Sequence, residues 1–341
     1  MSSIADTIFT KAEKAGASDV HIVVGSPIIF RINGELERQG KVKSTVAKVD
    51  QFIKAVLGPA QYKKFKENKE IDASYSTSAG VRLRINCHFE RGNMGLVARI
   101  IPTEIPSLEE IGLDNIEYLC DYEEGLILFT GPTGAGKTTS LASMVQHIAE
   151  HRGGHIVTLE DPIEFTFHSD KGLIRQRQYG SDFDSFPEAL KRILRQDPDI
   201  IMIGEMRDLE TISAALTMAE TGHLVFATLH TPNAVQTVDR IVDVFPPHQQ
   251  SQIRTQLSLS LKAIIAQRLV PCNHGGRIAH REVLINNAAV SNIIRDGRTQ
   301  ELTSVIQTGR DAGMCTFGKH AKELYKSDDI DKETYEWVKD L

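Results

Sequence analysis

The chain has 341 residues, of which 41% are hydrophobic and 25% charged, and its 45 acidic and 39 basic residues give a formal net charge of −6 at pH 7. This composition excludes a disordered acidic chain and a protein that binds nucleic acid through its overall charge. The length is typical of about two domains. The four cysteines form no Cys-x-x-Cys pair, so we expect reduced, incidental thiols. We expect neither a signal peptide nor a membrane span, because no apolar run approaches ~20 residues.

The first hundred residues have the pattern of a small α+β domain. Apolar spacing predicts helices over 4–15 and 47–68 and strands over 20–24, 28–32, 71–76, 81–90 and 94–101. Asn33-Gly34 is a typical hairpin turn between two of these strands. We therefore place the first domain at 1–101, and Pro102, Pro106 and Gly112 mark a linker or hinge over 102–115.

After the linker, the predicted strands alternate with predicted helices. The strands are expected over 126–130, 155–159, 200–203 and 224–229, and the helices over 137–151, 186–196, 211–220 and 235–242. This alternation is typical of a mostly parallel sheet covered by helices. An all-helical portion is expected at about 247–270 and from 288 to the end, which completes a second domain over 116–341.

The strongest motif lies between the strand at 126–130 and the helix at 137–151. It reads Gly131-Pro132-Thr133-Gly134-Ala135-Gly136-Lys137-Thr138 and matches G-x-x-x-x-G-K-[ST] in full. Glycines let backbone N–H groups wrap phosphates, and the following helix directs its positive end toward them. Lys137 supplies a charge to the β and γ phosphates, and Thr138 offers a hydroxyl to Mg²⁺. The alternative, an ordinary glycine-rich turn, is disfavoured by this strand-and-helix context.

Acidic residues follow two of the predicted strands. Glu205 comes after the apolar strand 200–203, where open α/β sheets bind their ligands and where ATPases place an acid for magnesium or water. Glu160, Asp161 and Glu164 follow the strand at 155–159. The residues alone leave two interpretations of this second group equally open: a site for water or magnesium, or a turn at Asp161-Pro162.

Histidines flank the predicted strand at 224–229. His230 ends the strand and is a candidate contact to a γ-phosphate, whereas His223 precedes it and is at least as well explained as a structural histidine. The spacing does not bring both onto one metal ion. Cys272, His274 and His280 could suggest a metal site. Because no second cysteine is near, we expect an exposed turn there instead.

Arginines are frequent in the first domain. Arg82 and Arg84 lie two apart on one face of a predicted strand, and Arg91 and Arg99 follow. Such residues are usually solvated. In an oligomeric ATPase they can instead reach the nucleotide of a neighbouring subunit and stabilise transition-state charge.

Together, and in this order, these motifs resemble those of the secretion ATPase superfamily of type II secretion and type IV pili. The phosphate loop is followed by Glu160-Asp161-Pro162-Ile163-Glu164, which is similar to the Asp box of the family. Asp199–Glu205 is similar to its Walker B box, and Thr221-Gly222-His223 with Thr228-Leu229-His230-Thr231 to its His box. The resemblance covers nearly the whole chain, because residues 16–21 are similar to the N-terminal opening of the family. It implies a RecA-like P-loop ATPase domain preceded by a small PAS-like α+β domain.

Within the superfamily the chain is most similar to the PilT-type retraction ATPases. It lacks a long extra N-terminal domain and the four-cysteine zinc insert of assembly ATPases. Residues 288–295 and 304–309 resemble the C-terminal retraction motif, with Val290-Ser291 where retraction proteins usually have Ile-Arg. The resemblance implies an ATPase motor that hydrolyses ATP to power pilus retraction and twitching motility.

The resemblance also implies roles for single residues. Glu164 is the expected general base, and Glu205 with Thr138 is expected to hold Mg²⁺, possibly through water. His230 is expected to sense the γ-phosphate and act on the hinge. Arg84 and Arg99 are expected to approach a neighbour's nucleotide. The nucleotide is expected to contact the run Gly131–Thr139, with Thr139 completing the phosphate loop.

For the assembly, the resemblance implies a ring of six identical subunits at the cytoplasmic face of the inner membrane. Its implied partner is the membrane platform protein of the pilus, and through it the pilin filament. Alternatives are a PilU-like accessory motor, another secretion or pilus-assembly ATPase, and a non-hydrolysing nucleotide-dependent scaffold or regulator. A DNA motor would need a local basic strip, such as Arg192, Arg195 and Arg207, because the sequence pI is about 6.1.

Overall fold

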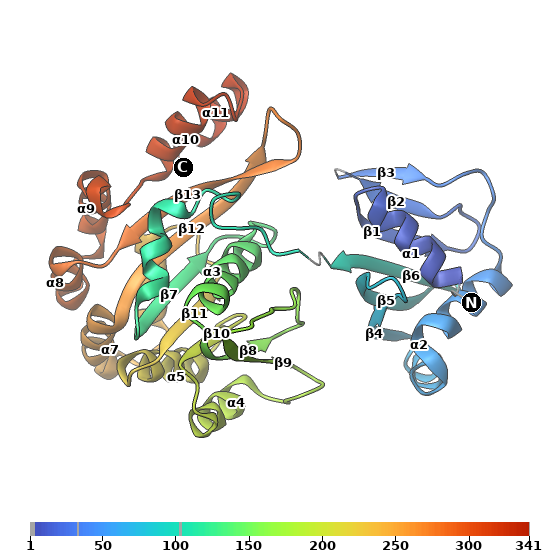
Figure 1. Ribbon diagram of the computed structural model, residues 1–341, viewed down its shortest axis with the longest axis horizontal. Helices are drawn as coiled ribbons and strands as arrows, with labels where there is room; N and C mark the ends of the chain where they lie inside the picture. Colours follow the sequence, from blue (N-terminus) through green and yellow to red (C-terminus); the bar gives the residue numbers. More distant parts are fainter. Residues whose placement is uncertain (1–3, 33, 102–103, 341) are drawn as a thin grey trace. The chain divides into compact units, whose positions relative to one another are not determined.

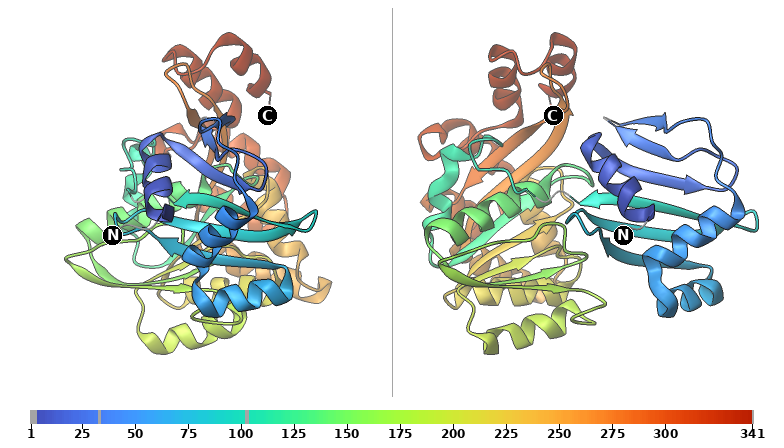
Figure 2. Two further views of the ribbon diagram at one scale, coloured as in Figure 1. Left: turned by 90° about the vertical axis from the view of Figure 1, so that its right-hand side faces the viewer. Right: turned by 45° about the vertical axis from the view of Figure 1, so that its right-hand side comes forward.

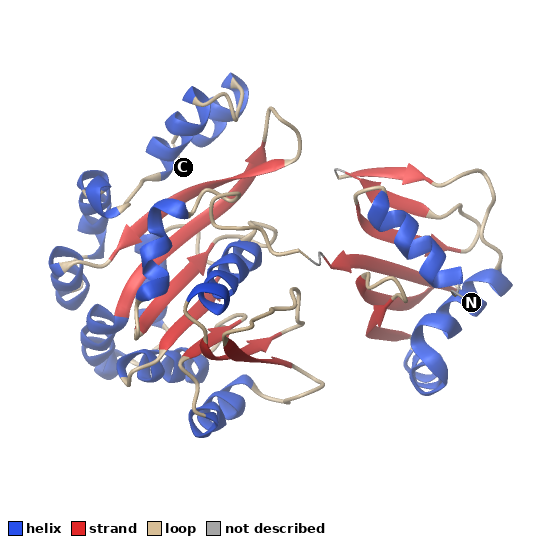
Figure 3. Cartoon of the chain, viewed as in Figure 1, coloured by secondary structure: helices blue, strands red, loops and turns tan. Residues whose placement is uncertain are grey.

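The computed structural model describes residues 4–32, 34–101 and 104–340. Contacts within the chain form two compact units, Met1–Glu104 and Ile105–Leu341 (Figure 1). Each unit has its own hydrophobic core. The first is built on an antiparallel sheet and the second on a mostly parallel one (Figure 3). The predicted α/β class, with an α+β part before it, is confirmed.

The N-terminal unit is a six-stranded antiparallel sheet in the order β3-β2-β1-β6-β5-β4. Its strands are β1 (Ala17–Val23), β2 (Ile29–Ile32), β3 (Glu35–Arg38), β4 (Glu70–Ser76), β5 (Arg82–Glu90) and β6 (Asn93–Ile101). Alternate residues of β5 point to opposite faces, so Leu83 and Ile85 are buried while Arg84 is exposed. Asn33 of the predicted hairpin turn lies outside the described residues.

Two helices cover the apolar face of this sheet. They are α1 (Ile4–Lys14) and α2 (Val46–Asn68) (Figure 2). Thr45 caps α2, because its hydroxyl accepts the N–H of Lys48. The helix bends at Gly58, whose φ of 67° is left-handed, just before Pro59. The opposite face of the sheet carries Arg82, Arg84 and Arg99.

The C-terminal unit is a seven-stranded sheet in the order β13-β12-β7-β11-β10-β8-β9. Its strands are β7 (Gly125–Thr130), β8 (Gly154–Glu160), β9 (Gly172–Gln178), β10 (Ile200–Ile203), β11 (Leu224–Leu229), β12 (Leu261–Pro271) and β13 (Arg277–Ile285). All neighbours pair in parallel except β12 and β13. Every residue of β7, β10 and β11 is buried, as expected for strands covered on both faces.

Helices and short 3₁₀ turns surround this sheet. They are η1 (Asp114–Asp121), α3 (Lys137–His151), α4 (Phe186–Ile193), η2 (Leu194–Gln196), α5 (Leu209–Glu220), α6 (Ala234–Asp243), α7 (Pro247–Ser260), α8 (Ala288–Asp296), η3 (Thr299–Glu301), α9 (Leu302–Thr308), η4 (Arg310–Ala312), α10 (Phe317–Lys326) and α11 (Lys332–Val338). No helix in the described part of the chain is both long and apolar enough to cross a membrane.

Two expectations for this unit were wrong or incomplete. The helix expected over 247–270 ends at Ser260, and residues 261–271 form strand β12 instead. Within β12, which lies between β7 and β13, residues 263–266 form a short buried apolar run, and periodicity alone does not tell a buried helix from a buried strand in such a run. Strand β9 was not predicted, because its polar residues give a weak pattern at a sheet edge.

The sheet edges are polar or covered. All four residues of β3 are exposed, and they include Glu35, Glu37 and Arg38. β9 carries Arg175 and Arg177 at one edge of the larger sheet. At the other edge, Val283 of β13 pairs with Cys315 in an isolated bridge.

Candidate active site

The phosphate loop joins β7 to α3 through strained glycine positions. Gly131 has a φ of +140° and Gly136 a φ of +80°, conformations that other residues rarely adopt. A Cβ on Gly131 would lie 2.1 Å from the carbonyl oxygen of Gln267 on β12. A Cβ on Gly134, by contrast, would meet nothing within 4 Å. The loop is therefore packed tightly against β12 at its start and open at its centre.

Lys137 is the first residue of α3 and is buried at the base of this loop. Its Nζ donates to the carbonyl oxygens of Gly131 and Pro132, at 2.7 and 3.0 Å. Burial lowers the pKa of Lys137, and the carboxylates of Glu205 and Glu164 oppose this effect. The ammonium of Lys137 is thus held in place by carbonyl groups of the phosphate loop itself.

Three parallel strands end at the same edge and bring distant residues together. In register, Ile203 of β10 lies beside Leu159 of β8 and Ala227 of β11. The residues that follow each strand therefore share one edge of the sheet, where α/β proteins bind ligands. The turn after β10 is fixed by a hydrogen bond from Gly204 N–H to the carbonyl of Leu159, and the Thr228 hydroxyl donates to the carbonyl of Gly204.

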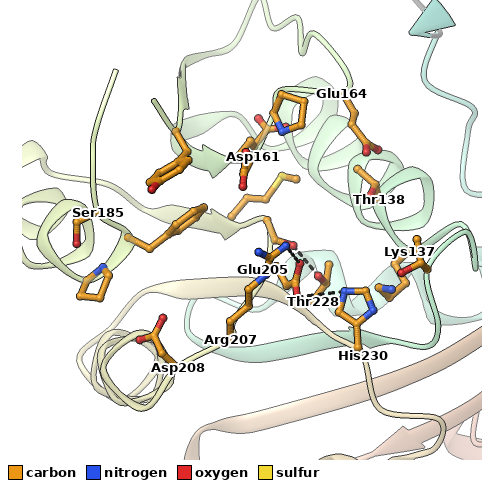
Figure 4. Close-up of a pocket in the computed structure, with 18 of the residues that line it drawn as sticks. Lys137, Thr138, Asp161, Glu164, Ser185, Glu205, Arg207, Asp208, Thr228 and His230 are labelled. Carbon is orange, nitrogen blue, oxygen red and sulfur yellow. Dashed lines mark hydrogen bonds and ion pairs between the residues drawn. The ribbon is translucent and has the colours of Figure 1, made fainter. Parts of the chain in front are cut away.

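Glu205 lies at this edge between His230 and Arg207 (Figure 4). Its Oε1 is 3.1 Å from His230 Nε2, and its Oε2 accepts a hydrogen bond from Arg207 at 2.8 Å. Burial raises the pKa of Glu205, but the hydrogen bond from Arg207 and the proximity of His230 outweigh it, so the net pKa is lowered. The carboxylate is accordingly held in its charged form.

The acids after β8 differ sharply in environment. Glu160 is buried, and its Oε1 accepts hydrogen bonds from Thr158 and Gln176. Burial raises the pKa of Glu160 more than these hydrogen bonds lower it. Asp161 and Glu164 are exposed, and Asp161-Pro162 is a cis peptide. The second acidic group is therefore a turn that also directs carboxylates into the pocket.

These residues line one cavity of about 510 Å³ in the C-terminal unit. Its walls include predicted residues from the phosphate loop and from the ends of β8, β10 and β11: Thr133, Gly134, Lys137, Thr138, Glu164, Glu205 and His230. Gly136 and Thr139 instead border a second cavity of about 460 Å³ on the other side of the loop, with Gln267 and Arg281.

One wall of the first cavity was missed by sequence reasoning. Tyr179 and Phe186 stack there, with ring centroids 5.9 Å apart, beside Asp184 and Ser185. Arg207 and Asp208 also line the cavity. Three aromatic residues from 179 to 186 could have indicated this wall of the cavity. They could not be placed there from the sequence, because they follow the edge strand β9, which was not predicted.

The other histidines singled out from the sequence, His223, His274 and His280, do not line this cavity. His223 Nδ1 lies 3.1 Å from the carbonyl oxygen of Met218 and does not line the cavity. Cys272 and His274 occupy the turn between β12 and β13, as expected, but His280 does not belong to that turn. It is buried in β13, where its Nε2 lies 2.7 Å from the carbonyl oxygen of Phe317. Among residues 4–32, 34–101 and 104–340, no group of three or more His, Cys, Asp or Glu could hold a metal by itself.

The predicted arginines lie in the N-terminal unit. Arg84 of β5 and Arg99 of β6 are directly opposite each other on adjacent strands. Arg99 Nε donates to Asp19 Oδ1 at 3.0 Å, yet 72% of the Arg99 side chain is exposed. The two arginines form a basic pair on the sheet face that the helices leave open.

A phosphate loop after a central parallel strand, with a charged acid at the end of a neighbouring strand, defines a P-loop nucleotide triphosphatase of the RecA-like α/β class. The family model described as "Type II/IV secretion system protein" matches residues 1–335. The type IV pilus retraction ATPase PilT of Pseudomonas aeruginosa is 42% identical over 321 residues, which cover 94% of this chain and 93% of that protein.

Two further comparisons agree. PilU, a type IV pilus ATPase of the same organism, is 40% identical over 94% of this chain and 84% of its own length. The crystal structure of the pilus retraction motor PilT with bound ADP has a TM-score of 0.90 and 41% identity, covering 98% of this chain and 96% of that one. The chain belongs to the type II/IV secretion system protein family, within its PilT-type ATPases. The resemblance inferred from the sequence motifs is confirmed.

Proposed function

We propose that this chain is an ATPase motor that powers the retraction of type IV pili. The observation that carries the proposal is that full-length similarity to PilT coincides with a complete phosphate loop beside Glu205 and Glu164. A non-hydrolysing scaffold is disfavoured, because such a protein has no need for two carboxylates in the phosphate pocket.

ATP would bind with its phosphates against the N–H groups of residues 131–138 and the ammonium of Lys137. The oxygen donors of Thr138 and Glu205 suit Mg²⁺, which prefers hard ligands and usually keeps several waters and phosphate oxygens in its shell. A site with only two protein ligands is consistent with the lack of a larger acidic cluster among the described residues. When bound, the ion neutralises phosphate charge.

Of the two glutamates at the end of β8, Glu164 is better placed than Glu160 to act as the base. It is exposed on the cavity wall, whereas Glu160 is buried with its oxygen already occupied by Thr158 and Gln176. Glu164 would accept the proton of the attacking water. His230 contacts Glu205, so a change in the hydrogen bonding of Glu205 on ATP binding or hydrolysis would reach His230 directly.

We further propose a homohexameric ring in which Arg84 and Arg99 act on the nucleotide of a neighbouring copy. The segment 102–115 would be the hinge between the PAS-like domain and the ATPase domain; within it, Leu108 and Leu113 pack in the core of the C-terminal unit. The ring would work at the cytoplasmic face of the inner membrane on the platform protein of the pilus, and act on pilin only through it. No contact with nucleic acid is part of this proposal.

A mixing experiment tests the shared site. Lys137→Ala and Arg99→Ala proteins are each expected to lose most ATPase activity as pure rings. Mixed rings contain interfaces with an intact Lys137 from one subunit and an intact Arg99 from the next, so activity should partly return. Mixing Lys137→Ala with Glu205→Ala is the control, because both changes lie on the same unit and no interface regains a complete site of the kind proposed. If the mixture of Lys137→Ala with Arg99→Ala gains no activity over the control mixture, the shared site is contradicted.

An accessory motor like PilU is the second candidate. Ser291 occupies the position where retraction proteins usually have Arg, and its hydroxyl donates to the carbonyl of Ser258, 2.8 Å away, inside the C-terminal unit. Deleting the gene in its own host separates the two functions. Loss of a retraction motor should leave long pili and no twitching, whereas loss of an accessory motor should leave piliation near normal.

A further inference from the structure

Arg281 is a buried cation behind the phosphate loop. It lies on β13 and is 3% exposed. Within the described part of the chain, no carboxylate lies within ion-pair distance of it. Burial lowers the pKa of Arg281 to about 10, so it remains charged at neutral pH. A buried charge without a counter-ion is costly, and only well-placed hydrogen bonds make it tolerable.

The hydrogen bonds of Arg281 fix the orientation of Gln267. Arg281 Nε donates to Gln267 Oε1 at 2.9 Å, and the Ser140 hydroxyl donates to the same oxygen at 2.9 Å. Since an arginine N–H can only donate, the amide oxygen must face Arg281. The amide nitrogen of Gln267 is then left to donate to the carbonyl of Ala135, 2.6 Å away.

Gln267 in turn supports the phosphate loop along its length. Its amide nitrogen binds Ala135 and lies 2.8 Å from where a Cβ on Gly136 would be. Its backbone carbonyl closes the space beside Gly131. Gln267 therefore packs against both the start and the end of the phosphate loop. The orientation of its amide is set by the hydrogen bonds that Ser140 and Arg281 donate to its oxygen.

The same guanidinium reaches the segment that precedes the ATPase core. Arg281 Nη1 donates to the carbonyl of Gly112 at 3.2 Å. Gly112 is itself exposed, with a φ of +65°, between the buried residues Leu108 and Leu113. Gly112, Gly136, Gln267 and Arg281 all line the second cavity of about 460 Å³.

We propose that Arg281 is a positioning residue of the ATPase site: it holds Gln267 against the phosphate loop and, through Gly112, joins that loop to the segment leading to the N-terminal unit. Movement of the loop on binding phosphates is thereby transmitted to the start of the C-terminal unit through three hydrogen bonds, from Ala135 to Gln267, from Gln267 to Arg281 and from Arg281 to Gly112. This inference rests on the proposed nucleotide site and adds a route by which that site acts on the hinge.

The test uses the full chain with Arg281→Met, Arg281→Lys and, as a matched control, Arg310→Met, which removes an exposed arginine on η4. The dissociation constant of ADP and the KM for ATP should rise about tenfold in Arg281→Met, the change expected from losing one charge-assisted hydrogen bond, with kcat changed less. Arg281→Lys should recover part of the loss. Arg310→Met should behave as wild type.

Hydrogen exchange tests whether Arg281 transmits movement of the phosphate loop to Gly112 or only holds Gln267 against the loop. In wild type, saturating ADP should change the exchange of the amides at 111–113 as well as those of the phosphate loop. In Arg281→Met at saturating ADP, the loop should still respond but residues 111–113 should not. A response at 111–113 that survives in Arg281→Met overturns the proposal, as does an unchanged ADP affinity.

Two further proteins keep the outcome interpretable. If Arg281→Met does not fold, Gln267→Glu replaces it, because a carboxylate can still accept from Arg281 but cannot donate to Ala135. It should weaken ADP binding and uncouple residues 111–113, and wild-type behaviour in both measurements contradicts the proposal. Lys137→Ala tests the nucleotide site itself: if wild type and Lys137→Ala bind ADP equally, the proposed function has failed rather than this inference.

Discussion

His230 Nε2 lies 3.1 Å from Glu205 Oε1, although the two residues follow different strands of the parallel sheet. The other oxygen of the same carboxylate is bonded to Arg207 at 2.8 Å. Both oxygens of Glu205 therefore have a side-chain partner in the protein. A magnesium nucleotide that uses this carboxylate would share it with His230 and Arg207 or displace them, which makes Glu205 a point where binding and the protein's own contacts meet.

Exchanging Glu164 and Glu205 for amides should separate the roles proposed for these two acids. Glu164→Gln and Glu205→Gln should each lower kcat by about 100-fold or more, because proton transfer and charge stabilisation are contributions of that size. Only Glu205→Gln should also raise the Mg²⁺ concentration needed for half-maximal activity. Steady-state ATPase assays over a range of Mg²⁺ measure both effects. Glu150→Gln, an exposed acid on α3 outside the cavity, is the control and should have wild-type kinetics.

Two glycines of the phosphate loop should differ in their tolerance of alanine. Gly131→Ala places a Cβ 2.1 Å from a backbone carbonyl and should destabilise the fold by about 3 kcal/mol. Gly134→Ala has open space around it and should cost only about 1 kcal/mol for its positive φ. Urea unfolding measures both free energies. Equal costs would mean that β12 does not pack against the loop as described.

Glu160 and Glu205 should affect acid stability in opposite ways. The pKa of Glu205 is lowered by its partners in the fold, so Glu205 stabilises above its unfolded pKa of about 4.5 and this contribution is lost as pH falls through the lower folded value. The pKa of Glu160 is raised, so its ionisation destabilises the fold as pH rises above about 4.5.

Thermal unfolding at pH 4 and pH 7 checks this difference. Relative to wild type, Glu160→Gln should gain stability on going from pH 4 to pH 7, and Glu205→Gln should lose it. The same sign for both variants would contradict burial as the dominant effect on the pKa of Glu160, or the contacts with Arg207 and His230 as the dominant effect on the pKa of Glu205.

The cysteines should differ in reactivity toward a thiol reagent. Burial raises the pKa values of Cys87 and Cys120 to about 12 and that of Cys315 to about 11, so little thiolate forms at pH 8. Cys272 lies in a turn and is partly exposed. In the folded protein, Cys272 should react first with dithionitrobenzoate and Cys87 and Cys120 only after unfolding. A Cys272→Ser protein provides the control, because its fast phase should disappear.

Local sequence determined much of the fold. The phosphate loop, the strands that flank it and the acid after β10 were predictable, because glycine conformations and buried apolar runs are local properties of the chain. The parallel pairing of the strands explains why the site residues meet. Glu164, Glu205 and His230 each follow a parallel strand, so all three lie at the same edge of the sheet. The roles assigned to single residues, including Arg84 and Arg99, stay predictions, as do the domain boundaries.

The features that were not predicted from the sequence depend on contacts between positions far apart in the chain. The helix expected over 247–270 includes residues 261–270, because the short apolar run at 263–266 carries no period that separates a buried helix from a buried strand. Gln267 and Arg281 therefore had no assigned place beside a loop more than 130 residues earlier. The stacked pair Tyr179 and Phe186 was missed for the same reason, because it depends on the position of edge strand β9.

The charged strands β3 and β9 have a consequence for the ring of copies proposed above. An unpaired strand offers a row of free backbone groups to any similar strand that comes near, which is how ordered aggregates begin. Glu35, Glu37 and Arg38 on β3 and Arg175 and Arg177 on β9 make that approach unfavourable. In the proposed ring, these charges would keep neighbouring copies from pairing edge to edge through their sheets, so that contacts between copies would form through side chains.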